Sequence, residues 1–167
     1  IPMAGRTREG NNSISATSLR VPSDRALEYW TGRLDEYGVE REEIQERAGR
    51  LTLLFRDFEG QRIILVSDEH NEGVPGGIPW EKGPVPAEYA IIGLGPVQLT
   101  VPRVLQTVKV LTELMGFCYK GQYASPAAGQ PDILVFETGE GGTGAEVHVE
   151  ERTDLPQERL GRGGVHH

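Results

Sequence analysis

The chain has 167 residues, and its hydrophobic share of 37% and charged share of 25% are those of a globular protein. The formal net charge is −8, and no cluster of Lys or Arg offsets it, which excludes nucleic acid and anionic membrane surfaces as partners. No apolar run is long enough to span a bilayer, and the first residues lack a secretory-signal pattern. The single cysteine, Cys118, cannot form an intrachain disulfide. We therefore expect a cytoplasmic protein, with Cys118 as a small buried hydrophobe.

Residues 1–68 predict a strand, a helix and three more strands. The first strand ends at Val21-Pro22, Ser23 is suited to cap the helix that follows, and Gly38 is suited to end it in a left-handed conformation. A charged strand is expected over 40–47, with a turn at 48–49 and strands over 50–57 and 61–68. The helix stripe predicted to face the core consists of Leu27, Trp30, Leu34 and Tyr37.

Residues 69–90 are rich in proline and glycine and predict a linker laid over the surface. We expect Trp80 and Tyr89 to pin this linker to a neighbouring module. His70 is interpreted as a solvated loop residue, because no other candidate ligand lies at a metal-binding spacing from it.

Residues 91–151 repeat the pattern of the first 68, offset by about 80 residues. A strand ends at Val101-Pro102, a helix ends at Gly116, and strands follow over 117–123, 132–139 and 145–151. The inward face of this helix is predicted to contain Leu105, Val108, Leu111, Thr112 and Met115. The order strand–helix–strand–strand–strand thus occurs twice. It predicts an α+β fold in which two βαβββ modules form open, curved mixed sheets, each with a helix on one face.

This duplicated unit resembles the vicinal oxygen chelate superfamily of glyoxalases, bleomycin-resistance proteins and extradiol dioxygenases. The resemblance rests on "MGF" closing a helix, "DFEG" before a last strand, the run "IPWEKGPVPAEYAIIGLGPVQLTV" and the final "GRGGVHH". It points to the four-module bacterial ring-cleaving dioxygenases. It implies that the chain is incomplete and holds modules two and three, with 152–167 as the connection and the start of a further module.

The resemblance also implies where a metal would bind. First strands of the family carry a His-His-apolar pattern, which here matches only the end of the chain and indicates His167 as a ligand, with His166 as the fallback. The equivalent positions in the two complete modules are Ala16 and Pro96, which cannot bind a metal through their side chains. The family's glutamate position falls near Ile64 or Leu65 in the first module and near His148 or Val149 in the second. The remaining ligands are therefore expected outside these residues.

The function implied is a metal-dependent, extradiol-type dioxygenase that cleaves catechol- or hydroquinone-like aromatics with O₂. Two histidines and a carboxylate would hold Fe(II), or another divalent metal, and leave positions open for substrate and O₂. Two alternatives stay open: a non-catalytic, bleomycin-resistance-like protein that binds a small ligand, and a glyoxalase-type isomerase. Exposed apolar strands would also favour a homo-oligomer.

Three other patterns allow competing interpretations. Glu146, His148 and Glu150 alternate along one strand, so they could hold a metal or simply face water opposite a buried apolar face. The glycine-rich 139–144 lacks the Lys-Ser/Thr and the helix of a phosphate loop, which favours a hairpin turn. The terminal His pair is either the start of a strand or the remnant of a purification tag.

Overall fold

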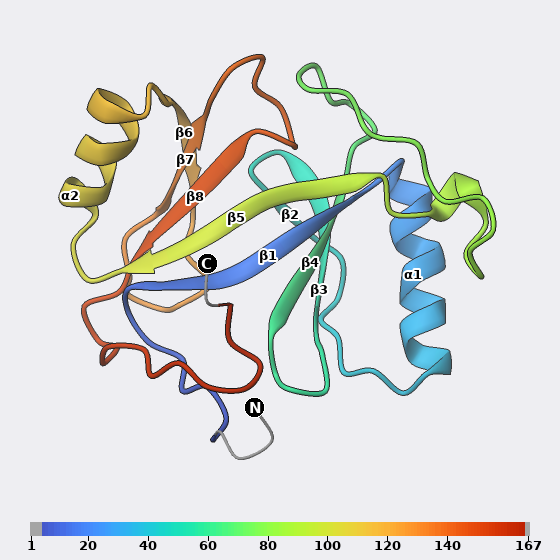
Figure 1. Cartoon of the computed structure of the whole chain (residues 1–167), viewed down its shortest axis with the longest axis horizontal. Helices are drawn as coiled ribbons and strands as arrows, with labels where there is room; N and C mark the ends of the chain where they lie inside the picture. The colour runs from blue at the N-terminus through green and yellow to red at the C-terminus, as the bar shows by residue number, and fades with distance from the viewer. Residues whose placement is uncertain (1–4, 166–167) are drawn as a thin grey trace.

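The strands predicted from the sequence form one curved, open sheet, shown in Figure 1 as a computed structural model that describes residues 5–165. The first half forms β1 (Ser13–Val21), α1 (Asp24–Glu36), β2 (Gln45–Arg47), β3 (Arg50–Arg56) and β4 (Arg62–Ser67). A short helix, η1 (Ala87–Tyr89), precedes the second half. That half forms β5 (Gly93–Val101), α2 (Val104–Lys109), η2 (Val110–Leu114), β6 (Cys118–Tyr123), β7 (Ile133–Glu137) and β8 (Glu146–Glu151).

The eight strands lie in the order β2-β3-β4-β1-β5-β8-β7-β6. In each half the first strand pairs in parallel with the last, β1 with β4 and β5 with β8, and the remaining pairs within a half are antiparallel. The predicted α+β fold with two βαβββ units is therefore confirmed. The two units also share one sheet, because β1 and β5, each the edge strand of its own unit, pair antiparallel with each other. This pairing covers the two edges that would otherwise be unpaired.

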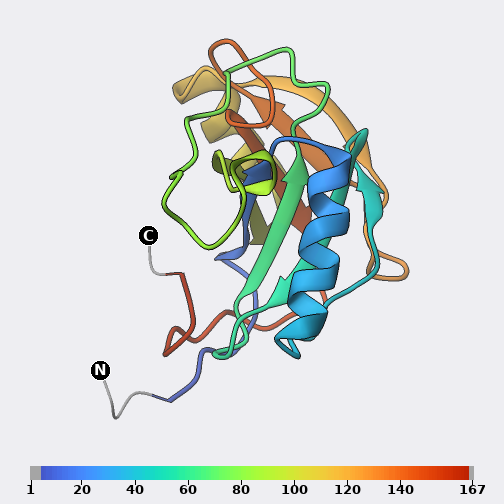
Figure 2. The ribbon, with the colours of Figure 1, turned by 90° about the vertical axis from the view of Figure 1, so that its right-hand side faces the viewer.

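The first helix packs on the outer, convex face of the sheet, alongside β3 and β4 (Figure 2). Ser23 caps it by accepting a hydrogen bond from the backbone N–H of Ala26 at 3.2 Å, and Gly38 follows it with a φ of +65°, as predicted. Leu27 and Leu34 are buried in the core. The prediction for Tyr37 was wrong: this residue lies just past the helix, is 67% exposed and packs against the guanidinium of Arg33 instead of the sheet.

The second helix covers the other half of the convex face, but it is short and continues as a single π-helical segment, Val110–Leu114. Leu111 is buried and Val108 packs against the same core, which confirms two of the predicted inward positions. Leu105 and Met115 were predicted to face inward and are 79% and 58% exposed. The helix presents Val104, not Leu105, to the sheet, and the π-helical segment changes the angle at which the later side chains leave the axis.

The linker, residues 69–90, contains no strand and only η1, in accord with its composition. Tyr89 holds its far end against α1: its ring stacks on Tyr29 at 4.5 Å, and its carbonyl accepts a hydrogen bond from the Trp30 indole N–H at 2.8 Å. The prediction that Trp80 pins the linker was wrong, because this residue is 71% exposed. The near end of the linker is instead fixed by polar contacts.

Those polar contacts centre on a buried ion pair at the end of β1. The guanidinium of Arg20 donates to both carboxylate oxygens of Asp68, at 3.0 and 2.7 Å, and to the carbonyl of Val74 at 2.7 Å. Asn71 accepts a hydrogen bond from the backbone N–H of Thr143 at 2.9 Å, and the N–H of Val74 donates to the carbonyl of Gly141. The linker therefore ties the first module to the β7–β8 turn of the second.

Two further observations complete the fold. Residues 152–165 run back beside residues 6–11 and form isolated bridges, such as Arg6 with Arg162 and Asn11 with Gln157. Cys118 is exposed at the start of the edge strand β6, so its predicted burial was wrong. The Phe117 next to it packs into the core under α2 instead.

Candidate functional site

The concave face of the sheet carries an unusual density of buried polar side chains. Glu146, His148 and Glu150 of β8 all point to this face and are buried, while Val149 between them is buried on the opposite face under α2. The interpretation that the three polar residues face water was therefore wrong. Both faces of β8 are covered. The curved sheet covers its polar face, and α2 covers its apolar face.

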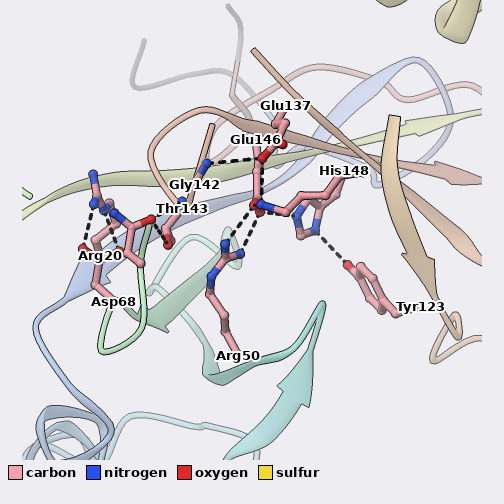
Figure 3. Close-up of polar contacts among 11 residues, drawn as sticks. Arg20, Arg50, Asp68, Tyr123, Glu137, Gly142, Thr143, Glu146 and His148 are labelled. Carbon is pink, nitrogen blue, oxygen red and sulfur yellow. Dashed lines mark hydrogen bonds and ion pairs between the residues drawn. The ribbon is translucent and has the colours of Figure 1, made fainter. Parts of the chain in front are cut away.

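A set of five residues spans the concavity, and we call it the clasp: Arg50, Lys120, Tyr123, Glu146 and His148. Figure 3 labels all of them except Lys120. Arg50 comes from β3 and Glu146 from β8, with three other strands between them in the sheet. Both Nη atoms of Arg50 donate to the Glu146 carboxylate, each at 2.9 Å. The clasp thus joins the two modules across the open side of the sheet, in addition to the β1–β5 pairing.

The Glu146 carboxylate also accepts from the ammonium group of Lys120 at 3.0 Å, and it lies 3.3 Å from Nε2 of His148. A carboxylate can only accept, so His148 must carry its proton on Nε2. Nδ1 of His148 is then free to accept a hydrogen bond from the Tyr123 hydroxyl at 3.1 Å. Burial raises the pKa of Tyr123 to about 12, which keeps this hydroxyl protonated as the donor.

Glu146 remains ionised in this setting. Burial by itself raises the pKa of its carboxyl group, but hydrogen bonds from His148, Arg50 and Lys120 outweigh burial and hold the pKa well below its ordinary value of 4.5. Lys120 divides its contacts, since its ammonium group also lies 2.7 Å from Glu137. With Glu137 counted, the two cations Arg50 and Lys120 face two carboxylates, so each of these ionised groups has a partner.

We expect the clasp to make stability fall in acid. The folded-state pKa of Glu146 lies below its unfolded value, so its contribution is present above pH 4.5 and is lost as the pH falls below that value. The urea midpoint should therefore drop between about pH 5 and about pH 3, and Glu146→Gln should show a shallower drop over the same range. The midpoints are measured by urea unfolding followed by circular dichroism. If the midpoint of the parent and that of Glu146→Gln changed equally with pH, the role of Glu146 would be contradicted.

Two cavities open onto this face. One, of about 420 Å³, is lined by the clasp residues Lys120, Tyr123 and Glu146 and by the β2–β3 turn at Ala48 and Gly49. The other, of about 290 Å³, is lined by polar residues of β1, β4, β5 and β8 and by the two terminal segments. The concave face can therefore admit a small molecule at two places.

The metal ligands predicted from the sequence, His167 and its fallback His166, lie outside the described residues. The equivalent positions in the two modules are apolar, as the sequence indicated: Ala16 is buried beside Ile64 and Leu54, and Pro96 is buried on β5. Within residues 5–165, no group of three His, Cys, Asp or Glu side chains is arranged to hold a metal ion. His148 and Glu146 come close together, but the carboxylate is already bound by Arg50 and Lys120. The residues of this face that the structure describes therefore do not fit a metal.

The sequence analysis missed Arg50, Lys120 and Tyr123 as partners of Glu146 and His148. A signal was present, because Lys120 and Tyr123 flank a glycine in a polar edge strand and Arg50 follows directly after the Ala48-Gly49 turn. This pattern indicates that the three residues are polar strand positions, but it does not indicate which strand each side chain will contact.

The comparisons with known proteins agree with one another. The chain is 45% identical, over all of its 167 residues, to MhqA from Bacillus subtilis (strain 168), a protein named for an inferred ring-cleaving dioxygenase activity. Its fold superposes with a TM-score of 0.79 on a crystal structure from Bacillus subtilis subsp. subtilis str. 168 that is described, also by inference, as a dioxygenase; identity is 24%, and the match covers 99% of this chain and 48% of that one. The chain is therefore a homologue of MhqA, and it shares the fold of this crystal structure.

Another solved structure shares the fold at much lower identity. Glyoxalase I from Zea mays superposes with a TM-score of 0.55 and 12% identity, over 92% of this chain and 46% of that one. Models of protein families give no match to the sequence. The chain spans 52% of the length of MhqA, so it corresponds to about half of that relative. Among the described residues, no helix has the length and apolar character needed to cross a membrane.

Proposed function

We propose that the chain is part of a metal-dependent, ring-cleaving dioxygenase that acts on catechol- or hydroquinone-like aromatics with O₂. The observation that supports this most strongly is the 45% identity to MhqA, which extends over every residue of the chain and both modules. The likeness to glyoxalase I supports the fold and not the reaction, because identity there is 12%. We extend the proposal to Fe(II) as the metal and to the cytoplasm as the compartment.

In this proposal the two modules, residues 1–68 and 91–151, support the chemistry and do not perform it. Their family ligand positions hold Ala16 and Pro96, and the face that could have replaced them carries the clasp. We propose His167, or else His166, as one metal ligand, with the remaining ligands in the part of the whole protein that these residues do not include. Residues 69–90 would serve as the linker, and residues 152–167 would lead into a further module.

The test uses the full-length protein, prepared without oxygen and loaded with Fe(II). His167→Ala should lower the bound iron and the rate of O₂ uptake with catechol or hydroquinone by about 100-fold, because metal affinity requires the complete ligand set. His70→Ala is the matched control: this histidine is exposed in the linker, and both readouts should stay unchanged.

The outcomes separate the alternatives. If iron is retained in His167→Ala and lost in His166→Ala, the fallback ligand is correct. A full-length protein that binds no divalent metal and takes up no O₂ with either aromatic would remove the dioxygenase proposal. A metal-loaded protein that isomerises a hemithioacetal, without O₂ uptake, would support a glyoxalase-type function instead.

A further inference from the structure

Within residues 5–165, one partly buried arginine of the concave face, Arg62, has no side-chain partner. Arg62 is the first residue of β4, and its side chain is half-buried and lines the cavity of about 290 Å³. Among the described residues, no hydrogen-bond acceptor and no carboxylate lies within bonding distance of its guanidinium group. A guanidinium group has five N–H donors, so leaving them unmatched in a half-buried position is unfavourable.

The neighbouring cations that are also partly buried have partners. Arg56, directly opposite on β3, pairs with Glu9 at 2.6 Å, and Arg47 pairs with Glu42 at 3.0 Å. On the far side of the cavity, Arg152 pairs with Asp154 at 2.7 Å. Burial, together with the positive charges of Arg56 and Arg47, lowers the pKa of Arg62, although it remains a cation at neutral pH.

Glu150, which is more fully buried than Glu59 in the same lining, has other partners. One of its oxygens accepts from Gln98 at 3.0 Å and from Thr100 at 3.2 Å, and the other accepts from Ser125 at 3.2 Å. Its nearest guanidinium is that of Arg152, at 3.7 Å. Glu150 therefore does not neutralise Arg62 by direct contact, and the positive charge of Arg62 faces the cavity.

The cavity suits a small ligand with one negative group. Its volume of about 290 Å³ is close to the lower end of the range for small-molecule sites. Besides Arg62, its lining includes the hydroxyl groups of Ser15 and Thr100, the apolar side chains of Ile14 and Leu155, and the charged side chains of Arg6, Arg56, Arg152, Glu9, Glu59, Glu150 and Glu158. Among the described residues, Arg62 is the partly buried cation of this lining that has no partner, and it lies beside hydrogen-bonding groups and two apolar side chains.

We propose that this cavity binds a small organic carboxylate, whose carboxylate group forms a two-pronged ion pair with Arg62. A planar guanidinium group matches a carboxylate in two parallel hydrogen bonds, and the apolar wall would contact the rest of the ligand. The site does not depend on the dioxygenase proposal, because none of the residues that argue for it is a proposed metal ligand.

The experiment titrates the protein with benzoate and, in parallel, with benzamide, its neutral isostere, by isothermal titration calorimetry. Benzoate should bind saturably below about 10 mM, and benzamide should not, because only the charged group can pair with Arg62. Arg62→Gln should lower the affinity for benzoate at least about tenfold. The affinity of Arg62→Lys should lie between that of the parent and that of Arg62→Gln. Arg103→Gln removes the same charge from an exposed position before α2 and should bind benzoate like the parent.

Urea unfolding of the same variants separates binding from a structural role. Arg62→Gln should unfold at the same urea concentration as the parent or a higher one, since it removes a half-buried cation that lies beside Arg56. Glu150→Gln should bind benzoate more tightly, because a negative charge near the ligand is removed. If the parent shows no saturable binding of benzoate, or if Arg62→Gln binds it as the parent does, the proposal is wrong.

Discussion

Replacing Arg50 by methionine is expected to lower the free energy of unfolding by about 3–5 kcal/mol, which is the usual effect of removing one partner of a buried ion pair. The side chain of Glu146 is completely buried, and Arg50 supplies two of its hydrogen bonds. Without Arg50, the Glu146 carboxylate keeps Lys120 and His148 but loses its bidentate partner. Urea unfolding at neutral pH, followed by far-UV circular dichroism, measures the loss.

Two controls make this measurement specific to the clasp. Lys109→Met breaks an exposed (i, i+4) pair with Glu113 and should change the free energy of unfolding by about 0.5 kcal/mol or less. The double variant Arg50→Met/Glu146→Leu removes both charges, so its loss should be smaller than the sum of the single losses. A loss of under about 1 kcal/mol in Arg50→Met would show that the modules do not depend on the clasp.

Gly73→Ala is expected to destabilise the protein by about 3 kcal/mol or more, because two backbone segments meet where its side chain would lie. A Cβ atom at Gly73 would overlap the carbonyl group of Gly141 in the β7–β8 turn. To relieve the overlap, the linker has to move away from that turn. The movement would break the hydrogen bond between Val74 and Gly141 and strain the contact of Asn71 with Thr143.

The matched control for Gly73→Ala is the same substitution at Gly32. That residue is exposed inside α1, and no atom lies within 4 Å of the position of its Cβ. Alanine favours the helix over glycine, so Gly32→Ala should raise the free energy of unfolding by about 0.5–1 kcal/mol. The midpoint temperatures of thermal unfolding of the two variants should therefore shift in opposite directions relative to the parent. A Gly73→Ala protein as stable as the parent would show that the linker is not tied to the second module.

Features of the fold that depend on a few neighbouring residues could be predicted from the sequence. The cap at Ser23, the left-handed glycines Gly38 and Gly116 and the duplicated order of elements all follow from local patterns. Helix faces were predicted less well where the helix departs from regular geometry. A shift of one residue at the start of α2 and the π-helical segment after it turned Leu105 and Met115 outward.

The candidate site depends on distant contacts, and the sequence could not predict it. Alternation along β8 showed that Glu146, His148 and Glu150 share a face. The same pattern fits both a face exposed to solvent and a polar face that is buried in the fold. Only the curvature of the whole sheet brings Arg50, 96 positions earlier in the chain, against Glu146. Likewise, the predicted strand over 61–68 includes Arg62, but only the placement of the surrounding ion pairs shows that this arginine has no partner among the described residues.

The central strands of the sheet have a consequence for how the chain reaches this fold. Both partners of β1 and both partners of β5 come from remote parts of the chain, since Thr17 pairs with Ile63 and Val97, and Val97 also pairs with Val147. Long loops must close before these ladders can form, and the entropy lost in closing them is recovered late. Such a topology places refolding toward the slow end for a protein of this size, with the outer hairpins β3–β4 and β6–β7 free to form first.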